Sequence, residues 1–174
     1  MRDFSSRIVV MRDGSSEVVE PSAIAASLLR EEDLEREIVH YPALLGEELL
    51  MLGSQLAEFA EDRDRLDVLM LDRDGELVLV ELKASENFRV TDLQALAYAG
   101  GYASTSTEHL ARTLQKTLER TEGRDVDLDE AVQQIVEWVS DIDEFAEWTP
   151  SQRVRIKLVA PSFPQRVLTT VNAW

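Results

Sequence analysis

The chain has 174 residues, 44% of them hydrophobic, which indicates one folded domain with a sizeable core and excludes wholesale disorder. It contains no cysteine, so disulfides, cysteine-ligated zinc and a cysteine nucleophile are excluded, and its two histidines leave little scope for histidine-based metal or triad chemistry. Its net charge of −16 should repel nucleic acid at long range and attract cations, so any nucleic-acid function needs a specific local site.

The first half of the chain shows strand and helix patterns in turn. β-branched runs on either side of Asp13-Gly14 predict a hairpin, because Asp-Gly favours a tight reversal between two strands. A helical spacing of apolar residues then ends before Pro42, and three strand-like runs follow, the last two almost continuously apolar, as in strands covered on both faces. The predicted elements are a hairpin within residues 1–20, a helix over 21–40, a short helix over 44–52 and strands over 55–61, 65–71 and 76–82.

The second half of the chain is mainly helical. The predicted elements are helices over 90–102, 108–120 and 128–147, a strand over 153–160 and the start of a final helix over 163–174. We interpret the whole as one domain, with a hairpin (1–20), a core (21–103), a helical insertion (104–150) and a last core strand followed by the start of a final helix (151–174). Because the final apolar run is unfinished, we expect this domain to belong to a longer protein.

Two carboxylates are predicted to face each other across the second hairpin. If Asp72 faces Glu76 across the loop, Asp67 lies directly opposite Glu81, with Cβ atoms ~4.5–5.5 Å apart. Lys83, two residues beyond Glu81, is expected on the same face. Carboxylates that close on a covered face are costly to desolvate unless a cation lies between them. The three side chains therefore predict a site at one end of an otherwise apolar ribbon.

The ligand chemistry of this site favours Mg²⁺, with Mn²⁺ as a substitute. Hard divalent cations take oxygen ligands, which Asp67, Glu81 and the backbone carbonyl of Leu82 would supply. Such a cation would polarise a scissile phosphate and lower the pKa of a bound water. Lys83 would orient or deprotonate that water, or stabilise developing charge. Glu35, from the first helix, is predicted to complete the metal shell.

The run from Arg65 to Lys83 resembles the motif region of the PD-(D/E)XK nuclease superfamily. In this resemblance Asp67 matches the first Asp of the motif, and Glu81 with Lys83 matches its (D/E)xK part. The sequence departs from the family pattern in having Leu66, not Pro, before Asp67.

Two further segments extend the resemblance. Gln94, within Asp92–Tyr98, matches the Gln on the helix that follows the motif, and Asp33-Leu34-Glu35 resembles the helix that carries the family's early Glu. The nearest resemblance within the superfamily is to the catalytic domain of archaeal and actinobacterial mismatch-type DNA endonucleases.

The resemblance implies an α/β, restriction-endonuclease-like core: a helix, an antiparallel three-strand meander, a helix and a fourth strand parallel to the third, here with a helical insertion. It implies a Mg²⁺-dependent DNA endonuclease of DNA repair or defence, with DNA as partner and a homodimer as the expected assembly. The chain has no apolar run of the ~20 residues that span a bilayer and no secretory leader pattern, so we expect a cytoplasmic protein without a membrane partner.

Less specific interpretations stay open. Asp67 and Glu81 can be strand-end residues paired with Arg65 and Lys83 without a metal, and Glu35 can belong to a solvated helix face. The chain is then a catalytically inactive scaffold that binds nucleic acid or a protein partner, or an acidic mimic of DNA. Three cations alternate along the last strand and are expected to pair with acidic groups rather than with phosphate: Arg153, Arg155 and Lys157.

Overall fold

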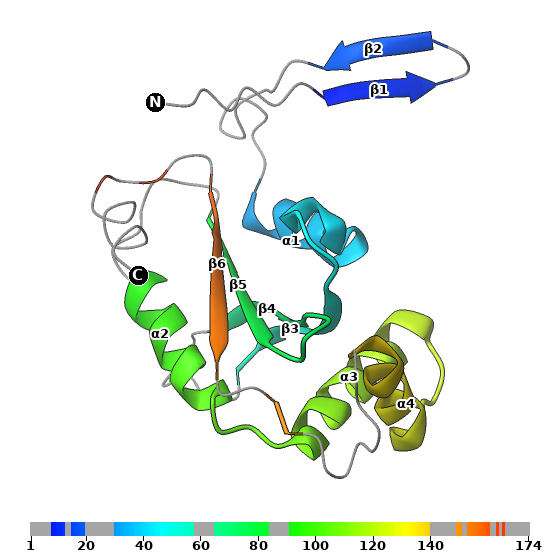
Figure 1. The fold of residues 1–174 in the computed structure, drawn as a ribbon, viewed down its shortest axis with the longest axis vertical. Coiled ribbons are helices and arrows are strands. Elements are labelled where there is room, and N and C mark those ends of the chain that lie inside the picture. Colours follow the sequence, from blue (N-terminus) through cyan, green and yellow to red (C-terminus); the bar gives the residue numbers. More distant parts are fainter. Residues whose placement is uncertain are drawn as a thin grey trace.

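The computed structural model describes residues 8–12, 15–19, 30–57, 65–83, 91–139, 149–150, 153–160, 163 and 165. Its elements are β1 (Ile8–Arg12), β2 (Ser15–Val19), α1 (Glu31–His40), the 3₁₀ helix η2 (Pro42–Leu45), β3 (Leu50–Leu56), β4 (Leu66–Leu71), β5 (Leu77–Leu82), α2 (Thr91–Tyr102), α3 (Thr107–Glu122), α4 (Leu128–Trp138) and β6 (Val154–Val159). The protein is an α/β chain, as predicted, with a four-stranded mixed sheet in the order β3-β4-β5-β6 (Figure 1). No described helix has the length and apolarity needed to cross a membrane.

The register of the β4–β5 hairpin agrees with the prediction. Val68 pairs with Val80 and Leu71 with Leu77, which is the alignment expected from an Asp72–Glu76 loop. One carboxylate oxygen of Asp72 accepts the backbone N–H groups of Asp74 and Glu76, at 2.9 and 2.8 Å. Gly75 has φ 78°, which an L side chain rarely adopts, so its glycine lets the reversal form without strain.

The outer strands complete the sheet as predicted. β3 pairs antiparallel with β4, with a bulge between Met51 and Gly53, and β6 pairs parallel with β5 from Leu77↔Val154 to Leu82↔Val159. The predicted N-terminal hairpin is also confirmed, because β1 and β2 pair antiparallel.

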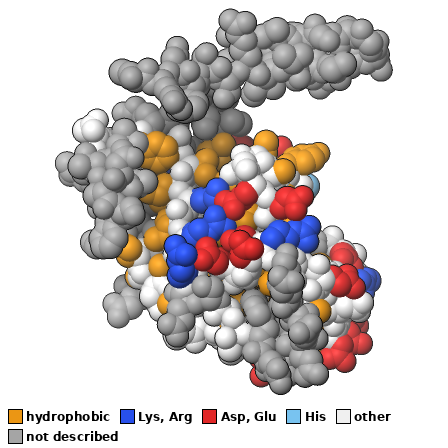
Figure 2. Space-filling model, viewed as in Figure 1, with side chains coloured by type: hydrophobic (Ala, Val, Ile, Leu, Met, Phe, Trp, Pro, Cys, Tyr) orange, Lys and Arg blue, Asp and Glu red, His pale blue; other side chains and the backbone are white. Residues whose placement is uncertain are grey.

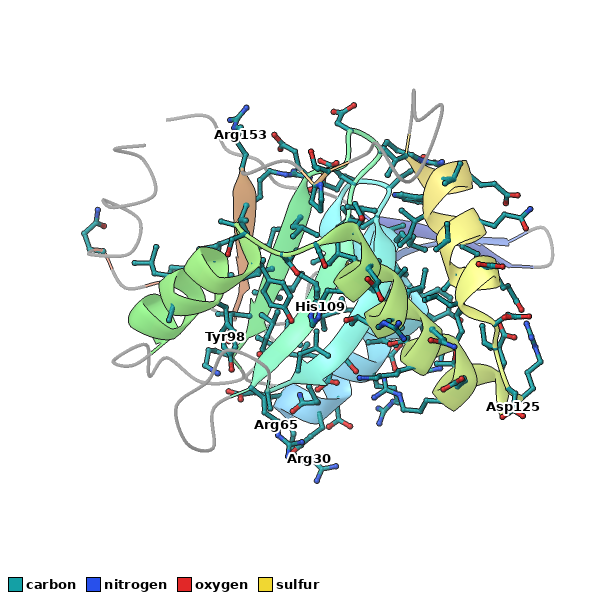
Figure 3. All side chains as sticks on the ribbon, turned by 90° about the horizontal axis from the view of Figure 1, so that it is seen from below. Arg30, Arg65, Tyr98, His109, Asp125 and Arg153 are labelled. Carbon is teal, nitrogen blue, oxygen red and sulfur yellow. The ribbon has the colours of Figure 1, made fainter. Side chains whose placement is uncertain are left out.

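Alternating side chains of β4 and β5 enter two different cores. One cluster takes five leucines from the two strands, Leu66 among them, and packs them against side chains of α2, α3 and α4, which lie across the sheet in Figure 3. The other cluster takes Val68, Met70, Val78, Val80 and Leu82 and packs them against side chains of α1 and η2. Covering on both faces explains why these strands are almost continuously apolar.

Three predicted elements differ from the structure. The short helix expected over 44–52 is wrong: η2 ends at Leu45 and is capped by Gly46, whose φ is 83°, and Leu50 already pairs with β4. The strand expected over 55–61 instead runs from Leu50 to Leu56, and residues 58–61 lie outside the described part of the chain.

The helix expected over 128–147 is too long, because α4 ends at Trp138. Val139 has extended backbone angles, φ −77° and ψ 130°, and its β-branched side chain is buried in the core. Most of the predicted helix over 163–174, and residues 21–29 of the first one, lie outside the described residues.

Candidate functional site

Asp67 and Glu81 meet at one end of the β4–β5 hairpin. Continuing the register beyond Val68↔Val80 places them opposite each other, as the sequence predicts. Asp67 Oδ2 accepts the backbone N–H of Leu82 at 2.8 Å, which joins this carboxylate to β5. Glu81 is only 1% exposed, so a fully buried carboxyl group lies next to a second carboxyl group, that of Asp67.

The buried pair is electrostatically unfavourable with both groups ionised. Burial, and after it the charge of Asp67, raise the pKa of Glu81 to about 8, against the opposing charge of Lys83. Burial also raises the pKa of Asp67, against the hydrogen bond from Leu82 and the charge of Lys83. Near neutral pH the pair therefore favours binding a proton or another cation, which relieves the repulsion between the two carboxylates.

Glu81 Oε1 is buried and has no hydrogen-bond partner among the described residues. A buried oxygen without a partner is costly, and a bound cation is one way of satisfying it. Asp67 and Glu81 supply oxygen donors of the kind that Mg²⁺ prefers. The N–H of Leu82 faces β4, and in an extended backbone the carbonyl of the same residue faces the same way, so it could offer a third oxygen to a cation held by the pair. The donor set fits a hard divalent cation.

Lys83 lies beside the pair. Its backbone N–H donates to Val159 O at 2.8 Å, which fixes the residue next to β6. Its Nζ lies 3.5 Å from Glu31 Oε2 on α1, and its charge lowers the pKa of both Asp67 and Glu81. Among the ion pairs of the described residues, none joins Asp67 or Glu81 to Lys83 or Arg65, while the charge of Lys83 acts on both acids, so a metal-free role for the pair stays an open interpretation.

Glu35 lies near Asp67 but is held by a different partner. Its Oε2 accepts the side-chain N–H of Gln55 at 2.6 Å, and its charge contributes to the raised pKa of Asp67. Within the described ranges, no three or more acidic or histidine side chains are gathered closely enough to hold a metal ion. The structure therefore brings together Asp67, Glu81 and Lys83, with Glu35 at the margin of the group.

Gln94 lies in α2, but its side chain is outside the described residues. Tyr98, one helical turn later, is 2% exposed and belongs to the core cluster. The prediction for Gln94 therefore stays a prediction.

Two residues of the site were missed by the sequence analysis. Glu31 precedes Glu35 by four residues, the spacing at which helical side chains share a face, so its pairing with Lys83 could have been considered. Gln55 gave no such signal, because its role depends on a left-handed backbone conformation, φ 54°, at a non-glycine residue.

The cations of β6 are used in ion pairs, as expected. Arg155 pairs with Glu47, Asp72 and Glu76, and Lys157 Nζ lies 2.5 Å from Glu47 Oε1. Basic and acidic side chains are interleaved on the face shown in Figure 2, so that no basic field for phosphate is seen there.

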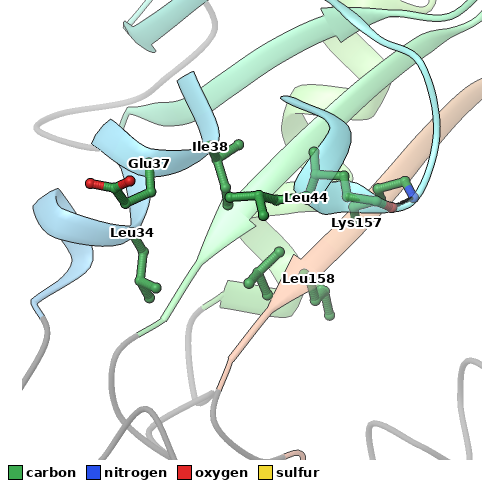
Figure 4. Close-up of a pocket in the computed structure, with 8 residues that line it drawn as sticks. Leu34, Glu37, Ile38, Leu44, Lys157 and Leu158 are labelled. Carbon is green, nitrogen blue, oxygen red and sulfur yellow. Dashed lines mark hydrogen bonds between the residues drawn. The ribbon is translucent and has the colours of Figure 1, made fainter. Parts of the chain in front are cut away.

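A separate cavity of about 410 Å³ lies between α1, η2 and β6 (Figure 4). Its lining is mostly apolar, with Glu37 and Lys157 as its charged members, and it includes neither Asp67 nor Glu81. The buried acidic pair is thus the better candidate for chemistry. No protein-family model, curated protein or solved structure matched the chain.

Proposed function

We propose that this chain is a Mg²⁺-dependent DNA endonuclease of the PD-(D/E)XK type, with a restriction-endonuclease-like core, acting in the cytoplasm in DNA repair or defence. The observation that carries the proposal is the pairing of the half-buried Asp67 with the buried Glu81, whose Oε1 has no partner among the described residues. The order of elements supports it: a helix, an antiparallel meander, a helix and a parallel strand are what the sequence resemblance implies.

Each residue of the site has a defined task in this function. Asp67, Glu81 and the Leu82 carbonyl would hold the cation, which when bound supplies Lewis acidity towards the phosphate and a more acidic water. The hydrogen bond from the Leu82 N–H orients Asp67 on β5. The Lys83 ammonium group, beside the pair, is suited to orienting the attacking water and stabilising charge that develops on the phosphate.

The test is a cleavage assay on labelled DNA that is single-stranded, duplex, mismatched or flapped, with an RNA arm. Parallel reactions contain Mg²⁺, Mn²⁺ or EDTA at low and high salt, because a net charge of −16 weakens DNA binding most at low ionic strength. We expect cleavage that requires the metal and falls by about 100-fold or more in Glu81→Gln.

Glu48→Gln is the matched control, because Glu48 is an exposed carboxylate that pairs across the surface with Arg73. Cleavage that survives in Glu81→Gln, or that is lost equally in Glu48→Gln, contradicts the proposal. Light scattering of the same samples with and without DNA tests the proposed homodimer.

A catalytically inactive scaffold that binds nucleic acid or a protein partner is the second candidate. It is favoured by the lack of a third acidic ligand within the described residues and by the pairing of Lys83 with Glu31. For this function we expect no cleavage of any substrate. We also expect no saturable Mn²⁺ site whose binding is lost in Asp67→Asn.

A further inference from the structure

Gln55, on β3, has a backbone conformation that is unusual for its residue type. Its φ is 54°, and no other non-glycine residue in the described part of the chain has a positive φ. This left-handed region is disfavoured by the Cβ atom, and non-glycine residues held there concentrate at functional sites. The surrounding structure must therefore impose the conformation.

The strand on the N-terminal side of Gln55 is held firmly against α3. Ser54 is buried, and its hydroxyl accepts a 3.1 Å hydrogen bond from Arg120 Nη2. A Cβ added at Gly53 would lie 3.0 Å from Thr113 Cγ2, so the β3 backbone approaches α3 as closely as glycine allows. These contacts fix the path of β3 just before the strained residue.

The left-handed conformation coincides with a contact to the opposite side of the sheet. Gln55 Nε2 donates a 2.6 Å hydrogen bond to Glu35 Oε2 on α1. The pairs Ser54↔Val68 and Leu56↔Leu66 flank Gln55 in the register, so the residue opposite it is Asp67. Gln55 thus connects the strand position next to Asp67 with the carboxylate on the neighbouring helix.

We propose that Gln55 is a positioning residue that holds the Glu35 carboxylate beside the Asp67–Glu81 pair, where Glu35 supports the bound divalent cation. This inference rests on the proposed function, because it presumes a cation at the pair. Partners that orient metal-site carboxylates affect metal affinity by about 10- to 100-fold when they are removed. The disfavoured backbone conformation of Gln55 is then what allows its side-chain amide to reach Glu35.

The test compares Gln55→Gly, Glu35→Gln and the double variant in two measurements, the Kd for Mn²⁺ from electron paramagnetic resonance and the Tm in EDTA. Gln55→Gly removes the amide and relieves the disfavoured φ, so we expect an unchanged or higher Tm together with an Mn²⁺ Kd raised about 10-fold. In the Glu35→Gln background, Gln55→Gly should cause no further loss of affinity, because both changes break one contact.

Gln133→Ala is the matched control, since Gln133 donates a 2.8 Å hydrogen bond to Glu137 on the exposed side of α4. Its Mn²⁺ Kd should equal that of the unchanged chain. Gln55→Asn, which tolerates the left-handed region but has a shorter amide, provides a second variant that should also weaken Mn²⁺ binding.

The outcomes separate this inference from the proposed function. An unchanged Kd in Gln55→Gly, or losses that add with Glu35→Gln, overturns the positioning role, even if Tm falls. When either of these results is found while the unchanged chain binds Mn²⁺ and Asp67→Asn abolishes that binding, the positioning role fails and the proposed function stands. If the unchanged chain shows no saturable Mn²⁺ binding, the proposed function and this inference fail together.

Discussion

Asp67 on β4 and Leu82 on β5 are joined by a hydrogen bond from the Leu82 backbone N–H to Asp67 Oδ2, 2.8 Å long. This bond continues the contact between the two strands beyond their last paired residues, Val68 and Val80. It keeps the Asp67 carboxylate next to the buried Glu81 even though the two acids repel each other. The site is therefore assembled by the sheet itself and needs no cation to bring its residues together.

Asp67→Asn should separate metal binding from folding. The asparagine side chain still offers an oxygen to the Leu82 N–H but removes the charge that raises the pKa of Glu81. In EDTA at pH 8 we expect the free energy of unfolding to rise by about 1 kcal/mol, because one buried charge is relieved. In Mg²⁺ the variant should gain no stability, whereas the unchanged chain should. Thermal unfolding in both buffers checks this, and loss of stability in EDTA contradicts it.

The stability of the metal-free protein should fall as pH rises from about 5 to 8. Glu81 has a folded-state pKa of about 8 against an ordinary value of 4.5, so the folded state binds the extra proton between these values. Its contribution is present at low pH and is lost as pH rises through 8, with a slope on the order of 1 kcal/mol per pH unit. Urea unfolding in EDTA from pH 5 to 8 measures the slope. In Glu81→Gln the slope should be smaller, and an identical slope in both proteins contradicts this assignment.

Lys83→Met should impair cleavage far more than folding. Lys83 is placed beside the acidic pair and is 20% exposed, and its ion pair with Glu31 is on the surface of α1. We expect cleavage to fall by about 100-fold or more, with the unfolding free energy changed by less than about 1 kcal/mol. Lys116→Met, at an exposed position of α3, is the control and should cleave normally. Equal rates for the two variants would exclude a catalytic role for Lys83.

Arg155→Met should destabilise the fold without involving the acidic pair. Arg155 lies 2.6 Å from Asp72 and 3.0 Å from Glu47, and so connects β6 to the hairpin loop and to the segment after η2. Removing it leaves the mostly buried Asp72 without its cation, which should cost about 2 kcal/mol. Arg112→Met breaks an exposed helix pair and should cost less than about 0.5 kcal/mol. Urea unfolding at neutral pH compares them, and similar values contradict the prediction.

Much of the sheet could be predicted because its signals are local. The β4–β5 register follows from a short loop with glycine at its left-handed position and from runs of apolar residues that fill both faces. β6 was expected to lie parallel to β5, and it does. The errors occurred where tertiary contacts overrode helical spacing: Leu50 pairs with Leu71 in the sheet, and Val139 leaves the helix to enter the core.

The sequence by itself determined that Asp67 and Glu81 face each other and that Lys83 lies next to them, because a hairpin's register depends on residues close together in the chain. Only the tertiary structure decided how α1 takes part: Glu31 contacts Lys83, and Glu35 contacts Gln55. Those contacts join residues far apart in the chain, and the second one depends on a left-handed conformation that Gln55 does not prefer by itself. Packing of β3 against α3 and of α1 against the sheet supplies the energy that holds Gln55 in that conformation, and no local pattern encodes it.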